Sequence, residues 1–284
     1  MWKDGRKDAF GEPFSGLTRQ VDDAFLNGHV CEKSCIGWMY IRNAGATVTS
    51  WRPTILGGED VFFMPENVPW GKEVHGGAPF CWPWFGRREG SPKHGLARYL
   101  EWRRIMPPDK VYYPRDRAEF ETESTPETMK IWPHEFRLRA TVAYERRNTL
   151  VFTFKETNTG KEPFESAFGL HPYFAVADAC QVALDGEPLP KPVVMKEIAT
   201  GEGVHRLEDR VRGISYTIKA PGMDRWYVWN PGVERTPLCE TLGPDEWKRF
   251  FCLEPHMGKP SLLEPGKSRT HTVRITVSKE KRAK

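Results

Sequence analysis

The stretch RLRATVAYERRNTLVFTFKETNTG, residues 137–160, alternates apolar and polar side chains on both sides of a short polar turn at Arg147-Asn148. Because successive side chains of a β-strand point to opposite faces of the sheet, this period of two predicts a β-hairpin over Phe136 to Lys155. The apolar face of the hairpin is expected to be buried. Its polar face is expected to look outward.

The same alternation recurs along the chain and indicates an all-β protein. Further strands are predicted at residues 214–218, 226–229 and 272–277. The chain has 25 glycines, 24 prolines and no sustained apolar stripe of helical period, so helices are expected to be few and short. Two are predicted, over Asp23 to Leu26 and Asp245 to Lys248. An antiparallel β-sandwich follows from this pattern.

No linker, composition shift or internal repeat divides the sequence, so residues 1–284 are expected to form a single domain. The segment from Pro107 to Thr128 is charged and contains proline. We expect it to run as a long excursion over one edge of the sheet.

Composition excludes several classes of protein. The chain has 284 residues, a net charge of +4 and charged residues spread along its length, which does not indicate nucleic-acid binding. No apolar run reaches the roughly 18 residues that a membrane-spanning helix needs. The amino terminus lacks the apolar core of a signal peptide, so a cytoplasmic location and no membrane partner are expected.

The six cysteines, at positions 31, 35, 81, 180, 239 and 252, mostly lie in apolar runs. They are interpreted as buried thiols of a reducing compartment. A zinc site would need a second pair of cysteines or histidines at ligand spacing, and the sequence has none, so no metal is expected.

The window His75–Trp102, HGGAPFCWPWFGRREGSPKHGLARYLEW, holds the densest group of candidate binding residues. It contains a glycine pair, the Arg87-Arg88 pair, and His94-Gly95 followed by Arg98. Together these indicate a polar, anionic ligand. The aromatic residues Trp82, Trp84 and Phe85 beside polar groups suit a sugar, whose ring has apolar faces and a polar rim. The alternative is a buried aromatic turn without a ligand.

Two further residues are candidates for proton transfer. His171 ends an apolar stretch in LHPYF, and histidine is the side chain best suited to exchange protons near neutral pH. Glu254 ends the apolar strand FFCLEP, where a buried carboxylate is costly unless it is paired or used. The structural alternatives are a core histidine bonded to a backbone carbonyl and a strand-end carboxylate that reaches solvent or an arginine.

The run GGAPFCWPWFG followed by HGLAR and a tryptophan resembles the aldose 1-epimerase (mutarotase) superfamily, specifically its hexose-6-phosphate mutarotase branch. The resemblance continues in order through FTFKETNTG, LHPYF, WNP, FFCLEP and L-x-PG. It implies a galactose mutarotase-like antiparallel β-sandwich, or supersandwich. It also implies that His171 is the general acid, that Glu254 is the general base, with Glu254 ionised and His171 protonated at rest, and that no cofactor is needed.

The resemblance extends to substrate binding. Arg98 matches a position that helps to hold a substrate phosphate, and His94 matches a histidine beside the sugar hydroxyls. The alternative for Arg98 is a surface ion pair. The sequence departs from the family pattern at His75, where phosphate binders carry a second arginine, and near Glu240 and Thr241, where the family has an aspartate.

A neutral imidazole at position 75 favours an anion with less charge than phosphate, such as a sulfonate, unless Arg87, Arg88 or Lys93 compensates. The sequence therefore predicts a mutarotase of an aldohexose with an anionic C6 group, either a hexose 6-phosphate such as glucose 6-phosphate or a 6-sulfonated sugar such as sulfoquinovose. The predicted substrate-binding residues are His75, Trp82, Arg87, Arg88, His94 and Arg98. The alternatives are a mutarotase of free aldoses and a non-catalytic sugar-binding or sensing module.

Overall fold

The computed structural model describes residues 29–34, 36–66, 74–105, 116–189, 195–199 and 203–279. The helix expected over Asp23 to Leu26 lies outside these residues. So does Cys35, while Cys31 lies on a strand whose side chains are not described. Every pairing between the described strands is antiparallel, as the alternation predicted.

The largest sheet has nine strands in the order β13-β12-β15-β16-β20-β8-β7-β6-β5. Along the chain its strands are β5 Arg103–Arg104, β6 Arg117–Glu123, β7 Phe136–Arg146, β8 Thr149–Asn158, β12 Val182–Leu184, β13 Glu187–Pro188, β15 Val204–Asp209, β16 Ile214–Lys219 and β20 Ser268–Lys279. The predicted hairpin forms its centre, with Phe136 opposite Asn158 and Tyr144 opposite Leu150.

A second layer covers the apolar face of this sheet. Its six-stranded sheet has the order β14-β17-β18-β10-β4, with β11 also paired to β18, and a three-stranded sheet has the order β1-β2-β3. Isolated bridges pair Val48 with Ala78 and Phe62 with Phe174, and each links a residue of one of these sheets to a residue outside the named strands. The strands are β1 His29–Ser34, β2 Gly37–Arg42, β3 Thr47–Pro53, β4 Phe80–Cys81, β10 Gly169–Leu170, β11 Tyr173–Ala175, β14 Met195–Ala199, β17 Arg225–Trp229 and β18 Phe250–His256, with the separate pair β9 Phe164–Ser166 and β19 Ser261–Leu263.

Helices are short and lie in the connections. They are α2 Pro126–Ile131, α3 Gly232–Arg235 and the 3-10 turns η1 Thr54–Leu56, η2 Ala97–Tyr99, η3 Ala179–Gln181, η4 Thr236–Leu238 and η5 Glu246–Arg249. The helix predicted over Asp245 to Lys248 is present as η5, one residue later. No helix within the described ranges is long and apolar enough to cross a membrane.

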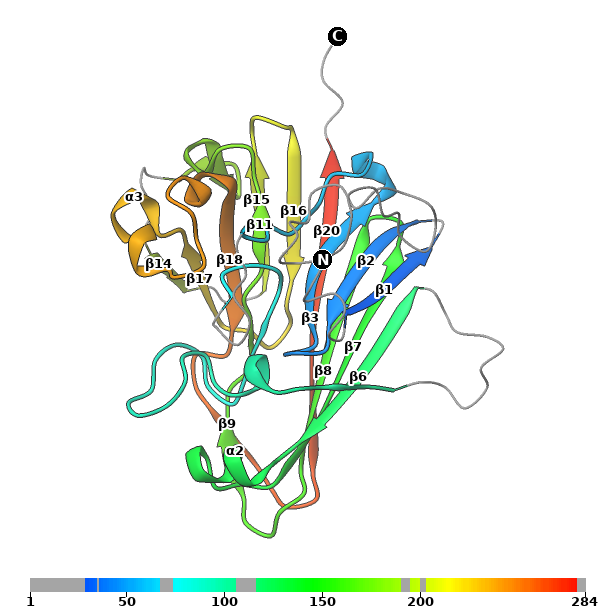
Figure 1. Ribbon diagram of the computed structural model, residues 1–284, viewed down its shortest axis with the longest axis vertical. Helices are drawn as coiled ribbons and strands as arrows, with labels where there is room; N and C mark the ends of the chain where they lie inside the picture. Colours follow the sequence, from blue (N-terminus) through cyan, green and yellow to red (C-terminus); the bar gives the residue numbers. More distant parts are fainter. Residues whose placement is uncertain are drawn as a thin grey trace, which may run out of the picture.

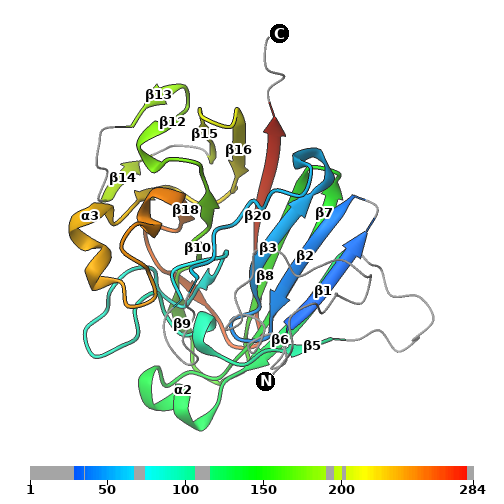
Figure 2. The same ribbon diagram turned by 45° about the horizontal axis from the view of Figure 1, so that its top comes forward.

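The core lies between the two layers. Figures 1 and 2 show strands β1 to β3, in blue, lying over the central strands β7 and β8 of the large sheet. In β7 the buried and exposed residues alternate, so Phe136 and Leu138 face inward while Arg137 and Arg139 face solvent. One hydrophobic cluster contains residues of both layers, including Trp51 of β3. The expected outward direction of the polar face is confirmed.

The segment from Pro107 to Thr128 differs from its prediction. Residues 106–115 are outside the described chain, but β6 pairs along its length with β7 and belongs to the large sheet. Ala118 and Phe120 are buried and alternate with charged residues, so the strand signal was present among the charges. Helix α2 follows, capped by Thr125, whose side chain accepts a hydrogen bond from the Thr128 amide.

Candidate active site

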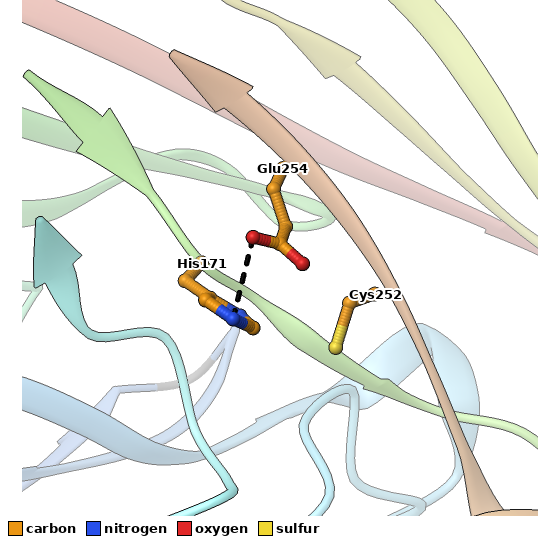
Figure 3. A group of neighbouring side chains, drawn as sticks. All are labelled: His171, Cys252 and Glu254. Atoms are coloured by element: carbon orange, nitrogen blue, oxygen red, sulfur yellow. Dashed lines mark ion pairs between the residues drawn. The ribbon is translucent and has the colours of Figure 1, made fainter. Parts of the chain in front are cut away.

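His171 and Glu254 come together from neighbouring strands. Glu254 lies on β18, and His171 lies between β10 and β11, both of which pair with β18. Alternation along β18 sends Phe251 and Leu253 into the main core and Cys252 and Glu254 to the opposite face. His171 Nε2 lies 3.3 Å from Glu254 Oε2, and both side chains are buried. Figure 3 shows the carboxylate and the imidazole facing each other.

Burial governs the protonation of this pair. It lowers the pKa of His171 well below its usual value, and the nearby His94, Arg98 and Lys93 lower it further. Burial raises the pKa of Glu254 to about 8, against the opposing effect of Lys93 and Arg98. These shifts favour a protonated carboxyl beside a neutral imidazole near neutral pH. This differs from the expected resting ion pair, because separated charges are costly without solvent.

A cavity of about 850 Å³ opens above the pair. His75, His94, His171 and Glu254 line it, as does Arg87, so five of the predicted site residues share one cavity. Its walls also include the aromatic residues Trp84, Phe85, Tyr227 and Trp229. The rings of Phe85 and His256 stack with centroids 4.0 Å apart. The mixture of rings and polar groups suits a pyranose.

His94 carries an N–H donor that no described residue uses. Its Nδ1 accepts a hydrogen bond from the Gly86 amide at 3.1 Å, so the proton of the neutral ring is on Nε2. Burial lowers the pKa of His94, which keeps the ring neutral. Nε2 is buried without a hydrogen-bond partner among the described residues. A buried donor of this kind needs an acceptor.

The two positions that depart from the family pattern contact each other. His75 Nδ1 lies 2.9 Å from Thr241 Oγ1, and the same oxygen accepts a hydrogen bond from the His75 amide. Both side chains are buried, and the His75 ring stacks on Trp229 with centroids 6.2 Å apart. Glu240, beside Thr241, lines the cavity.

Four cationic side chains line the cavity, namely Arg87, Lys93, Arg225 and Arg235. Arg225 is paired with Glu197 at 3.0 Å. Among the residues that the structure describes, none forms an ion pair with Arg87, Lys93 or Arg235. The Lys93 ammonium lies 5.9 Å from the centroid of the Trp229 ring. Its charge also acts on His171 and Glu254, which indicates that it lies close to the pair.

Three predicted binding residues do not line this cavity. Trp82 lies in the core, where its ring packs on Trp132 and Phe136 and its Nε1 donates to Glu156 at 2.8 Å. Arg88 lies over the outer face of Trp84, 4.8 Å from the ring centroid, and borders a second cavity.

Arg98 is the third. It is buried, its Nη2 donates to the Val74 carbonyl at 3.1 Å, and it borders a separate cavity of about 30 Å³. It therefore holds the segment before His75 and acts on the His171–Glu254 pair through its charge. A surface ion pair, the alternative from the sequence, does not fit a buried side chain.

Close backbone packing explains two glycines of the window His75–Trp102. A side chain at Gly77, whose φ is 69°, would come within 2.5 Å of the Val48 carbonyl oxygen. A side chain at Gly95, whose φ is 80°, would come within 2.1 Å of the Trp82 carbonyl oxygen. These glycines let backbone approach backbone and not a ligand.

Known proteins are similar to this chain in sequence and in fold. Residues 39–205 match the family model described as aldose 1-epimerase. A Cenchrus ciliaris protein named "Putative glucose-6-phosphate 1-epimerase" is 29% identical and covers 89% of this chain and 85% of its own length. An Escherichia coli protein of the same name is 29% identical over 74% of this chain and 76% of its own.

Solved structures share the fold. A "putative mutarotase" from Salmonella typhimurium superposes with a TM-score of 0.77 at 23% identity, covering 89% of this chain and 92% of its own. A "Putative aldose 1-epimerase" from Escherichia coli gives a TM-score of 0.70 at 15% identity, covering 89% and 99%. The family model spans more than half of the chain, and the site lies on the fold that these structures share. The protein therefore belongs to the aldose 1-epimerase family and is an epimerase-type isomerase.

Proposed function

We propose that the protein interconverts the α and β anomers of an aldohexose that carries an anionic group at C6. The observation that carries the proposal is the buried His171–Glu254 pair, 3.3 Å apart, in a sugar-sized cavity whose wall also has cations that form no ion pair with the described residues. The names of the relatives support a hexose 6-phosphate as the substrate. A 6-sulfonated hexose presents the same ring with an anion of lower charge.

Ring opening uses one proton that the pair already holds. Before the reaction this proton is assigned to Glu254, and its transfer to His171 produces the carboxylate and the imidazolium without changing the net charge. Glu254 then removes the proton from the C1 hydroxyl while His171 donates its proton to the ring oxygen. The C1–O5 bond breaks, and the product is the open aldehyde with a free C5 hydroxyl.

Ring closure reverses these steps on the other face of the aldehyde. Rotation about the C1–C2 bond turns the carbonyl, O5 attacks C1, His171 takes the proton of the C5 hydroxyl, and Glu254 returns a proton to the carbonyl oxygen. Each side chain acts as acid in one direction and as base in the other. The Nε2–H group of His94 is placed to donate to a hydroxyl of the bound sugar.

The anionic group is assigned to the cationic part of the cavity wall. Lys93 is half-buried and has Arg87 and Arg235 as exposed neighbours on the same cavity, so an anion there replaces solvent around groups that form no ion pair within the described chain. Ion pairs gain strength as they lose solvent. A mutarotase of free hexoses has no use for this excess of positive charge.

The proposal is tested by exchange NMR between the anomers of glucose, glucose 6-phosphate and 6-sulfoglucose, with and without the protein. We expect faster exchange for the two anionic sugars than for glucose. Glu254→Gln and His171→Asn should each lower the exchange rate by about 10²- to 10⁴-fold, the usual contribution of a positioned acid or base. Unchanged circular dichroism would show that both variants fold.

Three results would each reject a part of the assignment. Exchange that is no faster than in buffer for all three sugars rejects the reaction, and binding without exchange would favour a sensing module. Near-normal exchange in either variant rejects the role of that residue. Equal acceleration of glucose and the anionic sugars rejects the preference for an anionic C6 group but leaves the proposed proton transfer in place.

A further inference from the structure

The buried pair has a third neighbour that proton transfer does not use. A ring nitrogen of His171, the Cys252 sulfur and a carboxylate oxygen of Glu254 all lie within 4.8 Å of one another. Figure 3 shows the Cys252 thiol on the same side of β18 as Glu254, next to the His171 ring. Cys252 is fully buried, forms no disulfide and does not line the large cavity. We call His171, Cys252 and Glu254 the donor triad.

Strand geometry holds the donor triad in place. Cys252 and Glu254 are two residues apart on β18 and so point to the same face. Cys252 is paired with Tyr173 on one side and with Trp229 on the other, which fixes its backbone. Two of the three donors thus lie on one strand, and His171 lies in the short connection between β10 and β11, where its amide donates to the Pro79 carbonyl at 3.0 Å.

The three donors are those that zinc prefers. Zinc binds thiolate at about 2.3 Å, imidazole nitrogen at about 2.0–2.1 Å and carboxylate oxygen at about 2.0–2.2 Å. In a tetrahedral site these bond lengths separate the donor atoms by roughly 3.3–3.6 Å. The donor triad, at 4.8 Å or less, reaches this arrangement through small side-chain rotations.

Charge and hydrogen bonding point the same way. One divalent cation, one thiolate, one carboxylate and a neutral imidazole sum to zero charge, which a buried site requires. The thiol and the carboxyl each release their proton to solvent as the metal binds. Independently, His171 Nδ1 is a buried polar atom without a hydrogen-bond partner among the described residues. Among the described residues, the His171 side chain therefore contacts Glu254 and packs against neighbouring aromatic and histidine rings.

We propose that the donor triad is an inhibitory site for a thiophilic divalent cation such as Zn²⁺. The metal site rests on the placement of the three donors alone. Its inhibitory effect rests on the proposed function, because a metal that occupies His171 and Glu254 removes both the acid and the base. Mg²⁺, which prefers oxygen ligands, should not bind there.

The metal site is tested with Co²⁺, whose bond to a thiolate gives a charge-transfer absorption band. We expect one equivalent of Co²⁺ to produce this band in the wild-type protein and in Cys239→Ala, and Zn²⁺ to displace it. Cys252→Ala should lack the band. Cys239 is the matched control, because it is also a buried cysteine and lines the large cavity without belonging to the triad. His171→Asn provides a second test that leaves the thiol in place, and should also weaken the band.

The inhibitory effect is tested by anomer exchange with increasing Zn²⁺. We expect inhibition that a chelator reverses, unchanged sensitivity in Cys239→Ala, and a concentration for half-inhibition that rises on the order of 100-fold in Cys252→Ala, as loss of one strong ligand implies. Absence of the cobalt band from the wild-type protein, or its persistence in Cys252→Ala, would overturn the metal site. Because the absorption does not depend on catalysis, the metal site can fail or hold whether or not the protein exchanges anomers.

Discussion

Replacement of Glu156 by glutamine should destabilise the protein strongly, although the residue lies outside the cavity. Glu156 is fully buried on β8 and accepts hydrogen bonds from Trp82 Nε1, Arg269 Nε and His271 Nε2, each at 2.8 Å. The Ser166 hydroxyl donates a fourth. These donors hold the pKa of Glu156 down at about 2 against the effect of burial.

The size of the effect follows from these contacts. A glutamine amide has one acceptor oxygen, so its NH₂ group must face either the Trp82 or the Arg269 donor, and the Arg269 guanidinium loses its buried counter-ion. Removing one partner of a buried ion pair costs about 3–5 kcal/mol of unfolding free energy. At roughly 2–4 °C for each kcal/mol, the melting temperature should fall by about 10 °C.

The measurement is urea unfolding of the wild-type protein, Glu156→Gln and the control Glu165→Gln. Glu165 is exposed on β9, so its substitution should change stability by less than about 0.5 kcal/mol. Because the folded pKa of Glu156 is below its usual 4.5, its stabilisation is present above pH 4.5 and is lost as pH falls towards 2. The difference between wild type and Glu156→Gln should shrink by about 1.4 kcal/mol from pH 6 to pH 3.5. A difference below about 1 kcal/mol at pH 6, or one that does not depend on pH, would refute the reasoning.

Three further predictions concern the cavity. Anomer exchange should follow a bell-shaped pH profile, because the reaction needs one proton on the His171–Glu254 pair. Activity should fall above pH 8, where Glu254 loses this proton. It should also fall below the lowered pKa of His171, where the pair binds a second proton. A profile that is flat from pH 5 to pH 9 contradicts this scheme. Lys93→Met should lower kcat/KM for glucose 6-phosphate by about tenfold more than for glucose, while Arg98→Met should affect both sugars alike. If steady-state kinetics show the opposite pattern, Arg98 and not Lys93 binds the anionic group. His75→Arg should raise kcat/KM for glucose 6-phosphate about tenfold relative to 6-sulfoglucose, since phosphate carries the larger charge; equal changes for the two sugars would show that position 75 does not face the anion.

Periodicity along the chain predicted much of the fold, because a strand that is buried on one face records its geometry in its own side chains. The hairpin of β7 and β8, and the strands β16, β17 and β20, follow directly from alternation. Strand β6 was missed because its polar face is densely charged and only two of its residues, Ala118 and Phe120, are buried. Glu156 shares the parity of Phe152 and Phe154, so alternation alone could have placed its carboxylate in the core.

The site was harder to predict because its parts meet only in three dimensions. His171 and Glu254 were found because short motifs surround them, but their 3.3 Å contact depends on the pairing of β10 and β11 with β18. Trp82 lies two residues before Trp84, yet only Trp84 lines the cavity, because the two rings point to opposite sides of the segment. Proximity in sequence cannot tell a wall residue from the core residue that supports it.

The contact between His75 and Thr241 changes what the first of these residues implies about the substrate. Taken alone, histidine in place of an arginine removes a positive charge and favours a less charged anion than phosphate. The structure joins this position to the second departure, where the family pattern has an acid near Thr241. Glu240 beside Thr241 still supplies an acid to the cavity, and the His75 ring is held against Thr241 and Trp229. We therefore expect the balance between phosphate and sulfonate to depend mainly on the cavity cations that form no ion pair with the described residues, Lys93 first among them.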